Sequence, residues 1–305
     1  LFSLGLALSL WRLLRPRSLL DNAPLEKLLA KMVPLMRLPR LIQKGHLTAL
    51  AVTASSYSSG EHVTFYESAQ AVQPWVRSQR KAARDRITHE HLLASSAIPF
   101  VFPAKGITID GHTEYFGDGS MRQSAPIAAA IHLGAERVLV IGAGRMHEPR
   151  GDSTAPPSPS YPSLAQIAGH ALSNIFLDAL SVDVERVQRI NQTLSLIPEE
   201  KRTHSALRPV ELLVIAPSQR LDAIAARHVG DLPGPVRTML GALGVTSNMA
   251  DVRGAALASY LLFEQGYTQE LMALGRADTL ARRADVCRFF GWKDTGAALR
   301  TRLPT

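Results

Sequence analysis

TALAVTASSYSSGEHVTFYES, at residues 48–68, is the segment on which the fold depends. Its first part, residues 48–56, is a continuous apolar run with β-branched residues, which is typical of a strand buried on both faces. The small residues at 58–60 predict a turn, and the alternating pattern of residues 62–68 predicts a second strand. We therefore expect a sheet that begins here.

Two more buried strands are predicted further along the chain, RVLVIGAG at 137–144 and VELLVIAP at 210–217. Helical patterns lie around them. Residues 1–45 read as helical, and a long helix is predicted after Ser163, which has capping-box spacing with Gln166. This alternation predicts an α/β fold with a mainly parallel sheet flanked by helices. Because mostly short helical patterns follow, we divide the chain into residues 1–217 and a helical C-terminal region, 218–305.

The middle of the chain carries three more local signals. Asp110-Gly111 between GITI and TEYF predicts a hairpin, and APIAAAIHLG predicts a short helix that ends at Gly134. Residues 75–93 read as a helix with Arg77, Arg80, Lys81 and Arg84 on one face.

Composition narrows the class of protein. The chain has 305 residues, of which 46% are hydrophobic and 20% charged, so it is long and apolar enough for a sizeable core. Its net charge of +8 permits an anionic partner. The single cysteine, Cys287, excludes an internal disulfide and a multi-cysteine zinc site, and it favours a reducing compartment.

The chain starts with Leu1 and an apolar run, and Arg12, Arg15 and Arg17 follow that run. This order is the reverse of a secretory signal, and eleven apolar residues are too few to span a bilayer. We expect the chain to be a piece of a longer protein.

Two candidate ligand sites are weak. Gly142-Ala143-Gly144 follows a strand, but His147 stands where a dinucleotide fingerprint has its third glycine, and a proline-rich loop comes next. His89 and His91 are the only close histidine pair, yet side chains two apart on a helix point to different faces. We expect solvated histidines there, and neither a metal nor a cofactor.

The basic segment from Arg77 to Arg86 leaves two interpretations open, a solvated face or a contact with anionic phospholipid headgroups. Nucleic acid is not expected, because no recognised binding motif accompanies the charge and only 6% of residues are aromatic.

Asp118 is the best catalytic candidate. It follows the strand TEYF in the glycine-flanked turn Phe116-Gly117-Asp118-Gly119-Ser120. Glycines let other backbone and side chains approach closely. An isolated Asp-Gly is usually only a turn, but this one lies where loops of an α/β sheet carry chemistry.

HLLASSAIPFVFPAKGI at 91–107 and EYFGDGSMRQSAPIAAAIHLGAERVLVIGAG at 114–144 together resemble the C-terminal half of a bacterial patatin-like phospholipase. The resemblance implies a Ser-Asp dyad hydrolase that cleaves acyl esters of phospholipids or other lipids. It also implies that Asp118 is the base and that no histidine takes part. Ser95 and Ser96 match the family's ASSAIP stretch, where they are interpreted as packing and positioning residues.

The sequence departs from that family in one large respect. No Gly-x-Ser-x-Gly nucleophile elbow and no glycine-rich oxyanion loop before residue 48 occurs in it, and Ser120 has no elbow around it. We therefore expect this chain alone to be inactive and the nucleophile to lie upstream of Leu1 in the intact protein. The alternative is a non-catalytic relative that binds a membrane or a partner. A nucleotide-dependent enzyme is a distant third.

The resemblance implies a phospholipid or other lipid ester as substrate. We expect a cytoplasmic protein with peripheral contact at the inner membrane. The sequence leaves the oligomeric state and the specific lipid open.

Overall fold

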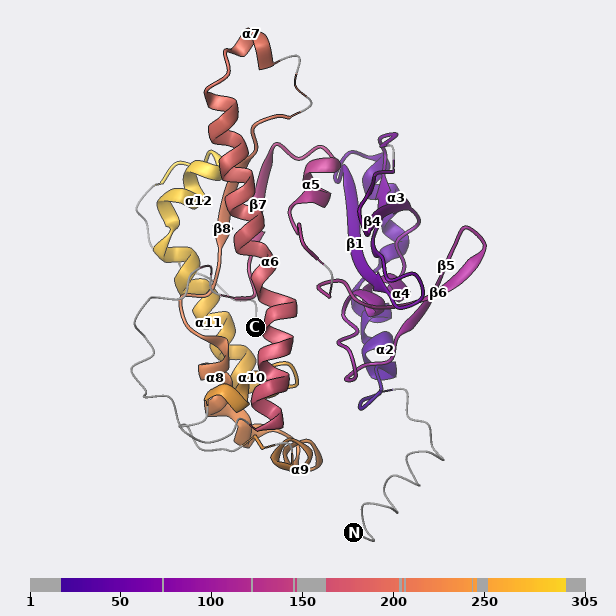
Figure 1. The fold of residues 1–305 in the computed structure, drawn as a ribbon, viewed down its shortest axis with the longest axis vertical. Helices are drawn as coiled ribbons and strands as arrows, with labels where there is room; N and C mark the ends of the chain where they lie inside the picture. The colour runs from indigo at the N-terminus through magenta and orange to yellow at the C-terminus, as the bar shows by residue number, and fades with distance from the viewer. Residues whose placement is uncertain are drawn as a thin grey trace. The chain divides into compact units, whose positions relative to one another are not determined.

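The computed structural model describes residues 18–72, 74–121, 123–144, 146, 163–202, 205, 207–242, 244–245 and 252–294. The chain forms two compact units, Leu1–Gly134 and Ala135–Thr305 (Figure 1). The predicted apolar start at residues 1–11, the arginines after it, His147 and the proline-rich loop before Ser163 lie outside the described residues.

A six-stranded sheet with the order β3-β4-β2-β1-β6-β5 forms the centre of the first unit. The strands are β1 (Ala49–Ser56), β2 (His62–Ser68), β3 (Val76–Arg77), β4 (Arg80–Arg84), β5 (Lys105–Ile109) and β6 (His112–Asp118). The helices are α2 (Ala23–Met32), η1 (Leu35–Arg37), α3 (Leu38–Gln43), α4 (His89–Ser95) and α5 (Ala128–His132). The segment at residues 48–68 supplies the two central strands, as predicted.

The α/β class is confirmed, and the six-stranded sheet is mixed in direction. Strand β2 runs parallel to β4, but β1 runs antiparallel to both of its neighbours, β2 and β6. The turn between β1 and β2 spans only residues 57–61, whereas a parallel crossover needs about a dozen residues or more. Short connections therefore produce antiparallel pairs where the apolar pattern alone predicted mainly parallel ones.

The predicted helix over residues 75–93 is wrong for most of its length. Residues 76–84 form β3 and β4, and the helix α4 begins only at His89. Gln79 takes a positive φ of 58° in the turn between the two strands. Because β4 pairs with β2 along its whole length, sheet hydrogen bonds outweigh the helical preference of the segment. Alternation along β4 puts Lys81 and Arg84 on opposite faces, so the basic residues do not form one helical face.

The core of the first unit lies between one face of the sheet and helices α3 and α4. Buried apolar side chains from both layers form it: Leu38, Ile42, Val52, Ala54, Val63, Phe65, Ile87, Ala94, Ile107 and Phe116. The ring of Phe65 packs edge-on against Phe116, with 5.4 Å between ring centroids. Burial of this face orients the strands and decides which residues of β6 point inward.

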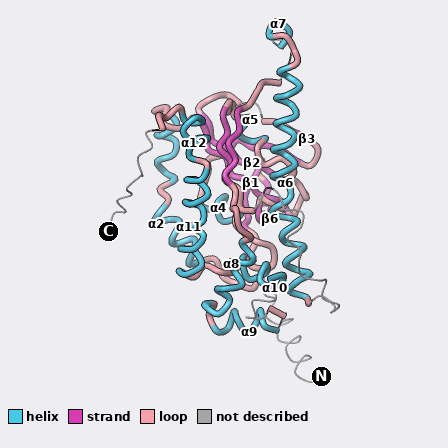
Figure 2. The backbone as a smooth tube through the Cα atoms, turned by 90° about the vertical axis from the view of Figure 1, so that its left-hand side faces the viewer, coloured by secondary structure: helices cyan, strands magenta, loops and turns pink. Residues whose placement is uncertain are grey.

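The second unit contains a parallel pair of strands, β7 (Arg137–Ile141) and β8 (Glu211–Ile215). Its helices are α6 (Leu164–Ser195), α7 (Glu199–Arg202), α8 (Leu221–His228), η2 (Val229–Asp231), α9 (Gly234–Ala242), α10 (Val252–Ser259), α11 (Gln265–Ala281) and α12 (Arg283–Phe290). Within this unit, α7 lies at one end of α6, whereas α8, α9 and α10 gather at the other (Figure 1 and Figure 2).

The predicted capping box of α6 is present. The hydroxyl of Ser163 accepts a hydrogen bond from the backbone N–H of Gln166, and the side-chain oxygen of Gln166 accepts one from the N–H of Ser163. The C-terminal region is helical, as expected, and α10 packs against α6 and α8. The predicted division after residue 217 marks the end of a family domain. The structural division after Gly134 separates two compact units and does not test where that family domain ends, so the division after residue 217 stays a prediction.

None of the helices in the described part of the chain combines the length and the hydropathy that crossing a membrane requires.

Candidate functional site

Asp118 is the last residue of β6, directly opposite Ala54 of β1. It lies on the sheet face that α4 covers, the same face as Phe116, and it is only 8% exposed. A buried carboxyl group at a strand end is unusual, since ionised side chains are rarely buried without a partner.

Two backbone hydrogen bonds hold the Asp118 turn against the end of α4. The N–H of Asp118 donates to the carbonyl of Ala97 (3.0 Å), and the N–H of Gly119 donates to the carbonyl of Ser95 (3.3 Å). Both acceptors belong to the ASSAIP stretch, so the two segments that carry the family resemblance meet in space. Ser95 acts here through its backbone, and the Ser96 hydroxyl donates to the Leu92 carbonyl of its own helix.

Burial raises the pKa of Asp118 above its ordinary value, and hydrogen bonds from Ser120 oppose that shift. The backbone N–H of Ser120 donates to Oδ1 of Asp118 at 2.8 Å. One carboxylate oxygen is thereby oriented. A carboxylate in this setting accepts a proton more readily than one in water.

The glycines on both sides of Asp118 lie in close contacts, and the contact at Gly119 requires a glycine. A Cβ atom at Gly119 would lie 2.3 Å from the carbonyl oxygen of Thr53, and one at Gly117 would lie 2.5 Å from the Tyr57 hydroxyl. The contact at Gly119 is with backbone and leaves no room for a side chain, whereas the contact at Gly117 is with the end of the exposed Tyr57 side chain, which can move aside. The prediction that this turn allows close approach is confirmed.

Tyr57 and His62 adjoin the Asp118 turn, and no pattern along the chain indicated either of them. The Tyr57 N–H donates to the carbonyl of Tyr115, and burial and the Asp118 charge raise the pKa of its phenol. Burial lowers the pKa of His62 to about 4, with Arg80 adding to the effect, whereas a hydrogen bond with the Gly119 backbone opposes it. Both residues are far upstream of Asp118 in the sequence, so only the β1–β2–β6 pairing reveals them.

Ser55 and His62 are register partners on β1 and β2, and each is 2% exposed. The Ser55 Oγ and the His62 Nδ1 have no hydrogen-bond partner among the described residues. Burial without a partner for Nδ1 agrees with the lowered pKa of His62, since an imidazolium would have to bury an unpaired N–H there.

The histidines His89 and His91 serve structural roles. His89 Nε2 lies 2.8 Å from the carbonyl of Val33. His91 is buried, and its Nδ1 accepts the N–H of Thr88, which completes the capping box of α4. The expectation of solvated histidines is wrong for His91, because the core ring of Phe65 packs against it at 4.5 Å between centroids.

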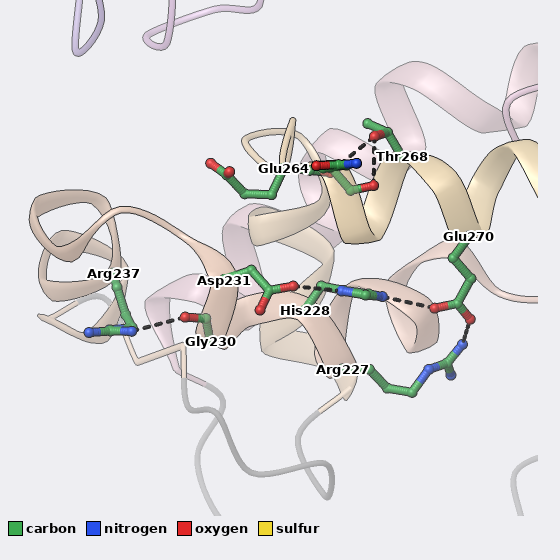
Figure 3. Close-up of polar contacts among 9 residues, drawn as sticks. Arg227, His228, Gly230, Asp231, Arg237, Glu264, Thr268 and Glu270 are labelled. Carbon is green, nitrogen blue, oxygen red and sulfur yellow. Dashed lines mark hydrogen bonds and ion pairs between the residues drawn. The ribbon is translucent and has the colours of Figure 1, made fainter. Parts of the chain in front are cut away.

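The second unit contains a cluster of charged side chains at the junction of α8, η2 and α11 (Figure 3). His228 lies between two carboxylates, with Nδ1 2.8 Å from Asp231 and Nε2 2.8 Å from Glu270. Arg227 forms an ion pair with Glu270 as well. These contacts raise the pKa of His228 and lower that of Glu270. The arrangement clamps α8 to α11.

Gly142 and Gly144 follow β7, and the N–H of Gly142 continues the strand pairing by donating to the carbonyl of Ile215. The glycine at 142 therefore extends the sheet, which agrees with a strand-to-loop turn.

Comparison with protein families matches residues 2–131 to the model described as Patatin-like phospholipase. The match ends within the first compact unit. Comparisons with curated proteins and with solved structures gave no match.

Proposed function

We propose, from the match of residues 2–131 to the patatin-like phospholipase model, that Asp118 is the general base of a lipid acyl hydrolase. The family supports hydrolysis of lipid acyl esters as the class of reaction. One observation carries the assignment to Asp118: a buried carboxyl group with a raised pKa, positioned by backbone contacts from the ASSAIP stretch.

The proposed reaction has two acyl-transfer steps. The Asp118 carboxylate takes the proton of a serine hydroxyl as that oxygen attacks the ester carbonyl, and the same proton goes to the departing alcohol oxygen. Water then attacks the acyl-serine ester, giving its proton to Asp118, which returns it to the serine oxygen as the fatty acid leaves. A base with a raised pKa assists the first proton transfer, because it binds the serine proton more strongly than an ordinary aspartate does.

The nucleophile is the missing part of this proposal. No Gly-x-Ser-x-Gly occurs in the 305 residues, so we propose that the serine and the oxyanion donors come from a segment beyond them. This chain alone is then inactive towards esters. Labelling of a serine in this chain by a fluorophosphonate probe would contradict that proposal.

The decisive experiment compares Asp118→Asn with the unchanged protein, using the full-length gene product. We expect the variant to lose hydrolysis of a phospholipid and of a short p-nitrophenyl ester while its circular dichroism spectrum stays the same. Unchanged turnover in Asp118→Asn would remove Asp118 from the catalytic machinery.

The second candidate is a non-catalytic relative that binds a membrane. The exposed cations beside exposed apolar residues on the first unit favour it. A full-length gene product that lacks a nucleophile elbow and binds vesicles would support this alternative, and esterase activity would dismiss it. Peripheral membrane contact is part of both candidates.

A further inference from the structure

An open groove of about 1150 Å³ lies beside α3, at the carboxyl ends of β2 and β4. Arg40 lines it on the helix side, and Arg84 and Arg86 line it on the strand side. The groove is remote from Asp118 along the sheet, since Glu67 and Ser68 on its floor stand at the far end of β2 from Val63, which is paired with Ala54. It is thus a feature that the proposed chemistry does not use.

The charged side chains that line the groove differ in whether they already have hydrogen-bond partners. Glu67 accepts the backbone N–H of Ile87 at 3.1 Å, and Asp85 accepts that of Arg86. In contrast, the guanidinium groups of Arg40 and Arg86 make no hydrogen bond or ion pair with any residue that the structure describes. Both of these arginines are exposed. Two exposed cations that line the same groove, one on α3 and one just after β4, are therefore available to an anion.

Arg84 completes the set in a different way. Its Nη2 donates to the carbonyl of Ser68 at 3.1 Å, which fixes the side chain at the groove wall. Arg37 and Lys44 flank the two ends of α3, three residues before and four after Arg40, so they lie on its side of the helix and extend the positive surface.

An apolar residue stands at the edge of this positive surface. Met36 lines the groove and is 79% exposed. An exposed, flexible apolar side chain beside cations is typical of a protein surface that inserts into the boundary between lipid headgroups and acyl chains. A surface for single-stranded nucleic acid would instead present aromatic rings for stacking, and none lines the groove among the described residues.

We propose that this groove holds the phosphate of an anionic phospholipid headgroup, between Arg40 and Arg86, and that Met36 enters the bilayer surface beside it. The choice of a lipid partner rests on the proposed function. The groove would then be the surface with which the first unit docks on an anionic membrane.

Flotation of the whole chain with vesicles tests this, because vesicle binding needs no hydrolysis. We expect binding to phosphatidylcholine mixed with phosphatidylglycerol, weakening in high salt, and no binding to phosphatidylcholine alone. Each basic residue near an anionic surface raises the partition coefficient roughly fivefold, so Arg40→Gln/Arg86→Gln should lower it about 25-fold. The matched control Arg189→Gln/Lys201→Gln removes two exposed cations of the second unit, and it should leave binding within about twofold.

A second measurement covers the case in which the double variant fails to fold. In a Cys287→Ser background, a fluorophore on Met36→Cys should shift to the blue on anionic vesicles. The same fluorophore on Leu196→Cys, which is 80% exposed on the second unit, should not shift.

Three results would overturn the docking surface: equal binding to neutral vesicles, equal losses in the two double variants, or a Met36→Cys label that stays in water. Groove-dependent binding of duplex DNA in place of vesicles would also overturn it. None of these outcomes touches Asp118. If the Asp118→Asn protein is inactive but still binds vesicles through the groove, the docking proposal and the catalytic proposal are shown to be independent.

Discussion

Gly119 and Thr53 approach so closely that a Cβ atom on residue 119 would lie 2.3 Å from the Thr53 carbonyl oxygen. The obstructing atom belongs to the Thr53 backbone, so a change of side-chain rotamer cannot relieve this contact. The Gly119 N–H also donates to Ser95, which ties the same residue to α4. Gly119 thus sets the distance between β1 and the turn that presents Asp118.

Replacing this glycine should damage both stability and the site. We expect Gly119→Ala to lower the free energy of unfolding by about 1–3 kcal/mol, because the backbone must shift to relieve the contact. Urea unfolding measures this. The control is Gly275→Ala on α11, where an added Cβ would meet open space, and there alanine should stabilise by about 0.5–1 kcal/mol. Equal effects of the two substitutions would refute the close-contact argument.

Asp118→Asn should stabilise the protein at neutral pH. Burial raises the pKa of Asp118, so the folded state disfavours the carboxylate, and stability is lower above the folded pKa than below the unfolded one. As the pH falls through the folded pKa, the unchanged protein regains that stability. The asparagine variant lacks this cost, and in the full-length protein it should lose about 10²- to 10⁴-fold in turnover. A neutral-pH melting temperature at or below that of the unchanged protein would contradict the stability argument.

The buried histidine His62 should make the first unit sensitive to acid. Its folded pKa is about 4, below the ordinary value near 6.5, so the folded state disfavours the imidazolium. Stability from the neutral ring is present above pH 6.5 and is lost as the pH falls towards 4, by roughly 3 kcal/mol.

Urea unfolding between about pH 7 and pH 4 tests this with His62→Gln. The variant should show a shallower decline, although His91 and His132 have lowered pKa values too and retain part of it. The control is His46→Gln, at an exposed histidine, and this variant should leave the decline in stability unchanged. A variant as acid-sensitive as the unchanged protein would remove His62 from the explanation.

The clamp at His228 should act in the opposite direction. Both ring nitrogens face carboxylates at 2.8 Å, and both donate only when the ring is an imidazolium. The pKa of His228 is raised, so its contribution is fully present below about 6.5 and is lost as the pH rises through the folded pKa. Two further contacts surround His228: Arg227 forms an ion pair with Glu270, and the Tyr267 ring packs edge-on against the imidazole.

We expect His228→Gln to lower the free energy of unfolding by up to about 1 kcal/mol at about pH 6 and to have less effect at about pH 9, because surface ion pairs contribute little. Urea unfolding at the two pH values measures it. A loss that is the same at both values would show that the ring acts by packing alone.

Local sequence signals predicted much of the fold correctly. The Asp110-Gly111 turn adopts the two positive φ angles, 51° and 82°, that its hairpin requires. Gly134 has a φ of 100° after the short helix α5, as its position predicted. These conformations depend on a few neighbouring residues, so they can be predicted from the local sequence.

The strands at residues 76–84 show where such local prediction fails. Their residues suit a helix by spacing. Hydrogen bonds of β4 with β2, which comes earlier in the chain, and of β3 with β4 hold them as strands. The direction of the sheet has the same origin. Apolar runs indicate burial and carry no information on which neighbour a strand pairs with.

The central strands, the hairpin and the capping box of α6 follow from the sequence alone, because they depend on short-range conformation. The proposal of Asp118 as the base also comes from the sequence, through the motif that carries the family resemblance. The tertiary structure was needed to learn that Asp118 is buried, that Ala97 and Ser95 hold its turn, and that His62 lies beside Gly119. The same is true of the groove that brings cations of α3 and the end of β4 together. Desolvation and contact distance arise when segments far apart in the chain pack together, and they set the chemistry of a side chain only then.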